Sequence, residues 1–303
     1  MLASGSTLRL CRRNAASFPP VSTQAARAYG PSALGGDARR FYELTLTMAR
    51  TEFKLRYFGS VLGYLWSLMR PLLFFGVLYL FFTKVVGLGK GIPHYGVYLL
   101  TCIVFWNFVA EATGSAVNCL VTREGLLRKV RFPRMVVPLS VSLTATFNLA
   151  MNFIAVIVFA TLDGVAFGVR WVELLPIAIA LIFLATGLAM LLSALYVRFR
   201  DVAPIWEVTL QVWFYTSPIM FPATSIARRF GPGLVHYALL NPVAILLTQA
   251  GYAFIGHDTK HFPPAERIAG LTTLVIALAT IPCIFALGWW FFSREAPRVA
   301  EEL

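Results

Sequence analysis

Long uninterrupted apolar runs most restrict how this chain of 303 residues can fold. A run of 18 or more residues with few charges predicts a helix that crosses a bilayer. Only helices and closed barrels satisfy their backbone polar groups within lipid, and continuous rather than alternating runs favour helices. Only 13% of the residues are charged, against about 25% in soluble domains. Six runs predict an all-α integral membrane protein with six transmembrane helices: 61–82, 95–120, 135–162, 174–197, 202–221 and 268–292.

A seventh apolar run, 234–255, is interrupted by Asn241-Pro242. Proline removes a helix hydrogen bond and clashes with the preceding turn. Irregular backbone at membrane depth is tolerated where protein or a water-filled cavity surrounds it. We therefore expect residues 222–258 to form short re-entrant helices that dip in from the outer face, between the fifth and sixth spans. A complete seventh crossing is the alternative, and it would place the C-terminus outside.

The segment 37–59 differs from these runs because it is amphipathic. Its basic face carries Arg40, Arg50 and Lys54, and Phe41 and Leu44 belong to a wide apolar face. Such a helix lies in the membrane interface rather than across it. A helix packed on a soluble domain is the alternative.

Charge predicts the orientation of the chain, which has a net charge of +12. If 234–255 does not cross, one side holds 18 lysines and arginines and the other holds 7. The positive-inside rule makes the richer side cytoplasmic, with both termini there. Residues 293–303 are then a cytoplasmic tail. Residues 1–36 contain four arginines and no acidic residue, which fits either a disordered basic tail or a mitochondrial transit peptide.

Signs of catalysis or metal binding are weak. The stretch GLGKG at 87–91 lacks the spacing of a phosphate-binding loop, and the four histidines lack metal-ligand spacing. Four cysteines without a CxxC pair are typical of packing residues. We expect no catalytic site, no metal site and no bound cofactor in this chain. A nucleic-acid partner is not expected either, because no soluble basic module with aromatic platforms is present.

Five short motifs follow one another along the chain: RYxxSxLGxLW at 56–66, FPR at 132–134, RDV at 200–202, SPI at 217–219 and NP at 241–242. In this order they resemble the type-2 ABC exporter permeases, specifically the branch that exports polysaccharides such as O-antigen, capsule and teichoic acid. The resemblance covers about residues 40–292 and makes 37–292 the permease domain. It also implies the bacterial plasma membrane, which favours the basic tail over the transit peptide for 1–36.

The resemblance implies a permease subunit of an ATP-driven exporter. Two copies of the chain would form the path as a homodimer. A separately encoded ABC ATPase would bind below with ATP and Mg, and the substrate would be a lipid-linked polysaccharide held among membrane lipid. Two other cargos or mechanisms remain as alternatives: export of a small lipid or drug by the same family, and an ion-coupled secondary transporter. A membrane-embedded glycosyltransferase or polymerase is a third alternative, which lacks the paired carboxylates it would need.

The resemblance also assigns roles to residues at the cytoplasmic face. The loop at 122–134 is similar to the coupling helix that docks on the ATPase, with apolar anchors and a dense group of cations: Arg123, Leu126, Leu127, Arg128, Lys129, Arg131, Phe132, Pro133 and Arg134. The 37–59 helix resembles the family's gate helix, whose candidate headgroup contacts are Arg50, Lys54, Arg56 and Tyr57.

Candidates for the substrate path are aromatic rings that stack on sugars, together with the charges inside spans: Trp66, Arg70, Tyr79, Trp106, Phe108, Glu111, Trp206, Glu207, Trp213 and Tyr215. Arg70 departs from the family pattern; it either faces the path, pairs with Glu111 or Glu207, or reaches the inner headgroups.

The charged turn YVRFRDV supplies Arg198, Arg200 and Asp201 between two spans. We expect Asp201 to cap the next helix, where the helix dipole favours an anion, and to form a local salt bridge with one of the two arginines.

Overall fold

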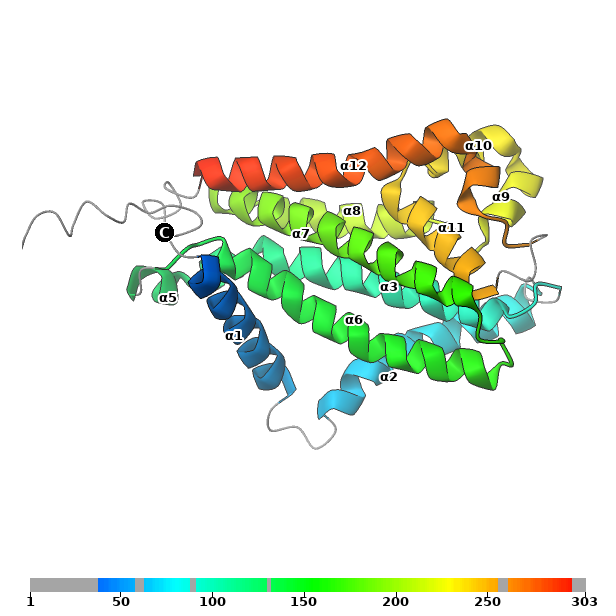
Figure 1. The fold of residues 1–303 in the computed structure, drawn as a ribbon, viewed down its shortest axis with the longest axis horizontal. Coiled ribbons are helices and arrows are strands. Elements are labelled where there is room, and N and C mark those ends of the chain that lie inside the picture. The colour runs from blue at the N-terminus through cyan, green and yellow to red at the C-terminus, as the bar shows by residue number, and fades with distance from the viewer. Residues whose placement is uncertain (1–37, 58–62, 88–90, 130–131, 256–260, 296–303) are drawn as a thin grey trace, which may run out of the picture.

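A computed structural model describes residues 38–57, 63–87, 91–129, 132–255 and 261–295, and these residues form helices without a strand (Figure 1). The helices in chain order are α1 (Ala38–Tyr57), α2 (Gly63–Leu80), the π-helical turn η2 (Phe81–Val85), α3 (Tyr95–Val117), α4 (Cys119–Thr122), α5 (Glu124–Lys129), α6 (Val136–Leu162), the 3-10 turn η3 (Val169–Glu173), α7 (Leu174–Arg198), α8 (Val202–Thr216), α9 (Ala223–Phe230), α10 (Pro232–Ala238), α11 (Pro242–Ile255) and α12 (Ala265–Glu295). The expected N-terminal tail 1–36 lies outside the described residues, as does the expected C-terminal tail 293–303 except for residues 293–295, which belong to α12.

Five stretches within the described residues are long and apolar enough to cross a membrane: Leu65–Val85, Tyr95–Val117, Val136–Leu162, Val169–Arg198 and Ala265–Glu295. They correspond to five of the six predicted spans. The all-helical, multi-pass membrane class predicted from the apolar runs is confirmed.

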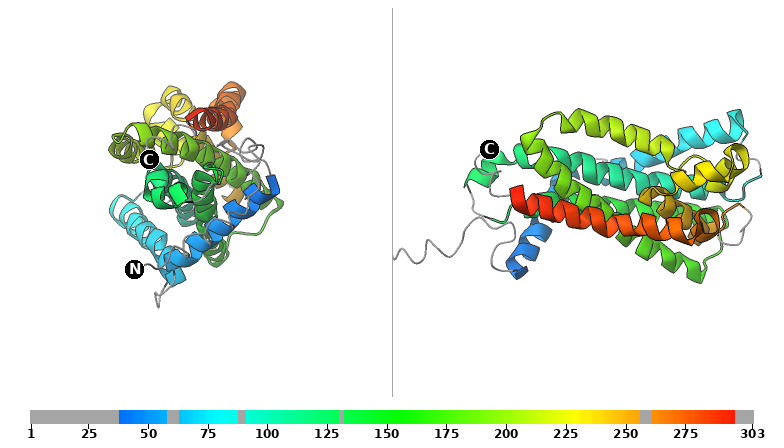
Figure 2. Two further views of the ribbon diagram at one scale, coloured as in Figure 1. Left: turned by 90° about the vertical axis from the view of Figure 1, so that its left-hand side faces the viewer. Right: turned by 90° about the horizontal axis from the view of Figure 1, so that it is seen from above.

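The long helices run side by side, so the connections gather at two ends of the bundle (Figures 1 and 2). One end, here called the α1 end, holds α1, α5, the α7–α8 turn and the C-terminal end of α12. The other, here called the α9 end, holds α9, α10 and the loops from α2 to α3 and from α6 to α7. The basic segments that the structure describes, α1, α5 and the α7–α8 turn, thus share one end.

The helix α3 forms the centre of the bundle because α2, α6, α7, α8 and α11 all pack against it. Nearly all of its side chains are buried, including Tyr98, Phe105 and Phe108. In contrast, α2 and α12 bury only a small share of their apolar surface. These outer helices offer the surface that lipid or another protein chain must cover.

The predicted fifth span is shorter than expected. Helix α8 has 15 residues and ends at Thr216, so it is about 22 Å long, whereas the hydrocarbon core is about 30 Å thick. Ser217 is extended, at φ −87° and ψ 146°, because Pro218 follows it and disfavours helical backbone before it. The residues 217–221 that were predicted to continue the fifth span therefore belong to a turn.

The interrupted seventh run forms two helices, α10 and α11, which are separated around Asn241. Helix α11 lies in the half of the bundle nearest the α9 end and contacts α3, α7 and α12 (Figure 1). Its 14 residues are mostly buried by these neighbours. The break at Asn241-Pro242 is therefore present, and protein surrounds the helix that follows it.

Candidate functional site

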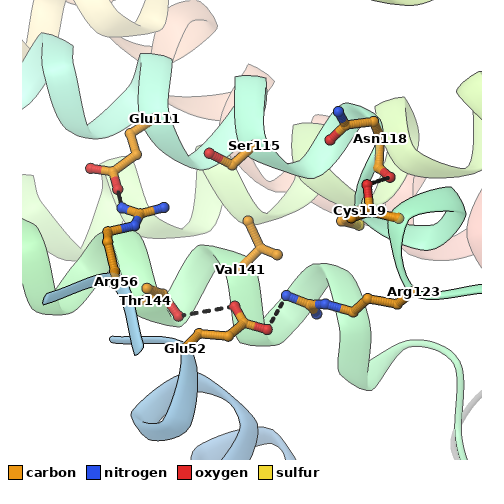
Figure 3. Close-up of a pocket in the computed structure, with 10 residues that line it drawn as sticks. Glu52, Arg56, Glu111, Ser115, Asn118, Cys119, Arg123, Val141 and Thr144 are labelled. Atoms are coloured by element: carbon orange, nitrogen blue, oxygen red, sulfur yellow. Dashed lines mark hydrogen bonds and ion pairs between the residues drawn. The ribbon is translucent and has the colours of Figure 1, made fainter. Parts of the chain in front are cut away.

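Helix α1 is joined to the bundle by charged side chains rather than by its apolar face alone (Figure 3). The guanidinium of Arg56 forms an ion pair with Glu111 of α3. Asn148 of α6 donates a second hydrogen bond to the same carboxylate oxygen, over 2.6 Å. Glu111 is therefore held by two elements besides its own helix.

A second ion pair lies one helical turn earlier on α1, between Glu52 and Arg123. Arg123 follows α4 and directly precedes α5, and its other terminal nitrogen donates to the Ser140 hydroxyl over 3.2 Å. The Thr144 hydroxyl lies 3.5 Å from the second Glu52 oxygen. Burial lowers the pKa of the Arg123 guanidinium from its usual value, because removing water disfavours the charged form.

The two ion pairs border a cavity of about 130 Å³ between α1, α3, α4 and α6 (Figure 3). Two carboxylates and two guanidiniums give its wall no net formal charge. The cavity is lined mainly by polar side chains: Glu52, Arg56, Glu111, Ser115, Asn118, Cys119, Thr122, Arg123, Val141 and Thr144. Its size and polar wall suit a few water molecules, with which the charged groups can exchange hydrogen bonds.

The residues expected to dock on an ATPase divide into two groups. Leu126 is exposed on α5, at the extreme tip of the α1 end. Leu127 and Phe132 instead pack partly against the buried cluster of Cys119, Leu120 and Met135.

The cations of this loop are also placed unevenly. Arg123 pairs within the chain, and partial burial lowers the pKa of Arg134. Arg128 and Lys129 belong to α5, whereas Arg131 lies outside the described residues.

The expected headgroup contacts on α1 also divide. Arg50, Lys54 and Arg56 are all exposed, but only Arg56, whose side chain is 42% exposed, pairs with Glu111 of α3. Tyr57 is the last residue of α1. Arg50 and Lys54 thus form the outward basic face, and the contact of Arg56 with Glu111 attaches the helix.

The aromatic path candidates do not share one environment. Trp106 and Phe108 are buried in α3, and Tyr79 stacks on Phe75 with ring centroids 5.4 Å apart. Trp213 lies between Trp106 and Trp206, at centroid distances of 5.8 and 6.1 Å. The Trp206 indole donates to the Thr113 hydroxyl over 3.1 Å. In the single chain Trp106, Trp206 and Trp213 connect α8 to α3.

The remaining path candidates are exposed on the outer helices. Trp66 and Arg70 lie on α2, and Glu207 and Tyr215 lie on α8. Glu111 is the partner of Arg56, so the suggested Arg70–Glu111 pair is not formed.

The charged turn Arg198–Phe199–Arg200–Asp201 corrects two expectations. Asp201 precedes α8, but its side chain makes no capping hydrogen bond. Its backbone is helical, at φ −69° and ψ −12°, whereas a capping residue is typically extended. The ion pairs between described residues do not include Asp201. Each arginine instead lies over a ring of this segment, Arg198 over Phe199 at 5.4 Å and Arg200 over Tyr196 at 5.3 Å.

Comparison with known proteins identifies the family. The model of the ABC-2 type transporter family matches residues 43–255, from α1 to the end of α11. The chain belongs to the ABC-2 type transporter family. It is 30% identical over 240 residues to the O-antigen export system permease protein RfbA of Myxococcus xanthus, which covers 78% of this chain and 88% of that protein. Two proteins of the same name from Klebsiella pneumoniae are 29% and 28% identical over 68% and 78% of the chain, and over 78% and 90% of their own lengths.

Two motifs of this ABC-2 type transporter, SPI and NP, meet in space. The Asn241 amide donates to the Ser217 hydroxyl over 3.1 Å, and its oxygen accepts the Val243 backbone N–H over 3.0 Å at the start of α11. Tyr95 donates to the Met220 carbonyl over 2.7 Å, and Tyr98 donates to the Pro218 carbonyl. Four side chains thus fix the turn that ends α8.

Sequence reasoning missed several polar residues of this ABC-2 type transporter: Glu52, Ser140, Thr144 and Asn148. Three of them, Ser140, Thr144 and Asn148, recur every fourth residue and share one face of α6. A polar stripe along an otherwise apolar helix is unlike a lipid-facing surface. That signal could have identified the face of α6 that receives α1.

Proposed function

We propose that the chain is the permease subunit of an ATP-driven ABC transporter that exports lipid-linked polysaccharide across the bacterial plasma membrane. The observation that carries the proposal is the similarity to O-antigen export permeases over about three quarters of the chain. The matched region includes α1, α5 and the SPI–NP contact, so it includes the parts with the most polar interactions.

In this proposal the chain crosses the membrane six times, with the short α8 as the fifth crossing. The α1 end is cytoplasmic, as the positive-inside rule requires for its arginines and lysines. Helices α9, α10 and α11 form a re-entrant unit that enters from the outer face. The burial of α11 among α3, α7 and α12 supports this arrangement, because the helix follows a break in the chain and irregular backbone at membrane depth needs protein around it.

The ATPase partner binds at the α1 end and holds ATP and Mg. Helix α5 is the docking element: it protrudes there, and its exposed Leu126 is an apolar anchor (Figure 1). Leu127, Phe132 and Arg123 contribute differently, because they attach the docking element to the bundle.

The translocation path lies between two copies of the chain, along α2 and α8, which lie on the same side of the bundle (Figure 2). Glu207, Gln211 and Tyr215 recur every fourth residue on α8 and are all exposed in the single chain. Lipid is a poor environment for a carboxylate and an amide. A water-filled path that also stacks sugars on Tyr215 and Trp66 suits this stripe.

The exposed cations Arg50 and Lys54 of α1 face the headgroup region in this proposal. The pyrophosphate of a lipid-linked glycan is an anion at that depth, and each nearby cation attracts an anionic surface by about 1 kcal/mol. Helix α1 would therefore receive the head of the substrate before it enters the path.

Deletion of the chain in its host tests the proposal. We expect surface polysaccharide to disappear and lipid-linked polymer to accumulate in the cytoplasm, measured by extracting the two fractions and separating them by length. Complementation with the wild-type chain should restore both. Unchanged glycan in both fractions, with altered export of a small lipid or drug, would refute the polysaccharide cargo.

A further inference from the structure

Glu52 and Arg56 stand one turn apart on α1 and bind parts of the chain that differ in how firmly they are held. Arg56 binds Glu111, which lies within the long, buried α3 and is also held by Asn148. Glu52 binds Arg123, which lies between the four-residue α4 and the six-residue α5. One contact therefore connects α1 to the centre of the bundle, and the other connects it to the base of a small protruding element.

The Glu52–Arg123 pair is partly buried, with side-chain exposures of 25% and 21%. It is therefore less screened by solvent than an ion pair on an open surface. A displacement of α5 that carries Arg123 with it acts on Glu52 through this contact. Such a displacement must either move α1 or break the pair.

Groups on α6 offer both partners an alternative position. The Ser140 hydroxyl lies 3.2 Å from the Arg123 guanidinium, and the Thr144 hydroxyl lies 3.5 Å from the Glu52 carboxylate. The adjoining cavity of about 130 Å³ leaves room for the side chains to shift. The pair can thus open and re-form along the polar face of α6 without leaving a buried charge unsolvated.

We propose that Glu52 and Arg123 are positioning residues that transmit movement of α5 to α1, and that the Arg56–Glu111–Asn148 group is the fixed point about which α1 turns. This inference rests on the proposed function, since it takes α5 as the element on which the ATPase acts. It adds a direct connection within one chain between the ATPase-docking element and the interfacial helix that receives the substrate.

The test compares Glu52→Gln with wild type in the complex of permease and ATPase. Three quantities are measured: the melting temperature and ATP hydrolysis rate of the purified complex, and the polysaccharide delivered to the surface of intact cells. We expect Glu52→Gln to keep the melting temperature and the hydrolysis rate but to lower polysaccharide delivered per ATP hydrolysed by about 10-fold, within the usual range of coupling between sites. The exchanged pair, Glu52→Arg with Arg123→Glu, should restore most of that ratio.

Glu43→Gln is the matched control, because Glu43 lies on the same helix and pairs with Arg39 in an exposed i,i+4 contact. It should leave the hydrolysis rate and the polysaccharide delivered per ATP unchanged, with only a very small change in melting temperature.

An unchanged ratio of polysaccharide delivered to ATP hydrolysed in Glu52→Gln overturns the inference. A lowered melting temperature with an unchanged ratio also overturns it, because the pair would then be structural only. If Glu52→Gln prevents assembly of the complex, the test uses the exchanged pair, Glu52→Arg with Arg123→Glu. An assembled complex with this pair that does not restore export overturns the inference. Failure of the wild-type chain itself to deliver polysaccharide counts instead against the proposed function.

Discussion

The attachment of α1 and the contact between α7 and α12 depend on different kinds of interaction. Helix α1 is joined to the bundle by ion pairs beside a polar cavity. Helices α7 and α12 touch through their backbones, because Gly187 and Gly288 bring them together. A Cβ atom on Gly288 would lie 2.1 Å from the Gly187 carbonyl oxygen, and one on Gly187 would lie 2.6 Å from the Phe285 Cα.

The difference indicates which parts of the chain can move. Close backbone packing between small residues is the usual basis of helix association in membranes, and a packed core of this kind has few alternative arrangements. Ion pairs with hydroxyls and space nearby can exchange partners at small cost. We therefore regard α7 and α12 as a fixed part of the permease and α1 as the part that shifts.

The largest effect is expected when the fixed contact is broken. Gly288→Val should destabilise the chain by about 3 kcal/mol or more, because the overlap is with backbone that no side-chain rotation can relieve. A lower melting temperature in detergent, or loss of folded protein, is the measurement. Gly114→Ala on α3 is the control, since no atom lies within 4 Å of its added Cβ and stability should be kept. Equal behaviour of the two variants would contradict the close-packed contact.

A smaller effect is expected at the fixed point of α1. Arg56→Gln should cost about 2 kcal/mol, since it leaves the partly buried Glu111 carboxylate without its cation. Melting of the purified chain measures the loss, and limited proteolysis within 38–57 measures the release of α1. The exchange of Arg56→Glu with Glu111→Arg should recover part of the stability. If the exchanged pair recovered no stability, the attraction between the two charges would not be what stabilises the attachment of α1.

The SPI–NP contact combines features of both regions. It is polar, like the attachment of α1, but it lies within the packed bundle at the end of α8, like the contact between α7 and α12. Asn241→Ala should cost about 1 kcal/mol through loss of the α11 N-terminal hydrogen bond and the bond to Ser217. Ser217→Ala removes the bond to Asn241 and the local bond from the Ser217 hydroxyl to the Trp213 carbonyl, but it keeps the N-terminal bond of α11 and should cost less. Thermal melting of both variants tests the order, and a reversed order would refute the capping role of Asn241.

The smallest effect is expected for Glu43→Gln, which removes the exposed α1 pair between Arg39 and Glu43. Their side chains are 87% and 60% exposed, so the change should cost only about 0.3 kcal/mol. Adding salt should remove this small difference in melting temperature, because salt screens the exposed pair that the variant lacks. A loss as large as that of Arg56→Gln would contradict the distinction between the inward and outward charges of α1.

The apolar spans could be predicted because a membrane helix satisfies its backbone within one local segment. Proline and asparagine likewise marked the break before α11 from local geometry. The partners of the charged residues could not be predicted in this way. Arg56 and Glu111 are 55 residues apart, and nothing in their neighbouring residues specifies that they meet. Arg123 was expected to face a partner protein, and its position beside Glu52 depends on how α1 packs on α6.

The sequence by itself determined the helical membrane class, the position of five spans and the family motifs. Each of these depends on composition within a short window or on the order of such windows. Only the tertiary structure decided that α8 ends at Thr216, that SPI and NP share a hydrogen bond and that Glu52 and Arg56 pair with Arg123 and Glu111. Those features arise where helices distant in sequence meet, because a buried charge or amide takes its partner from whichever helix packs beside it.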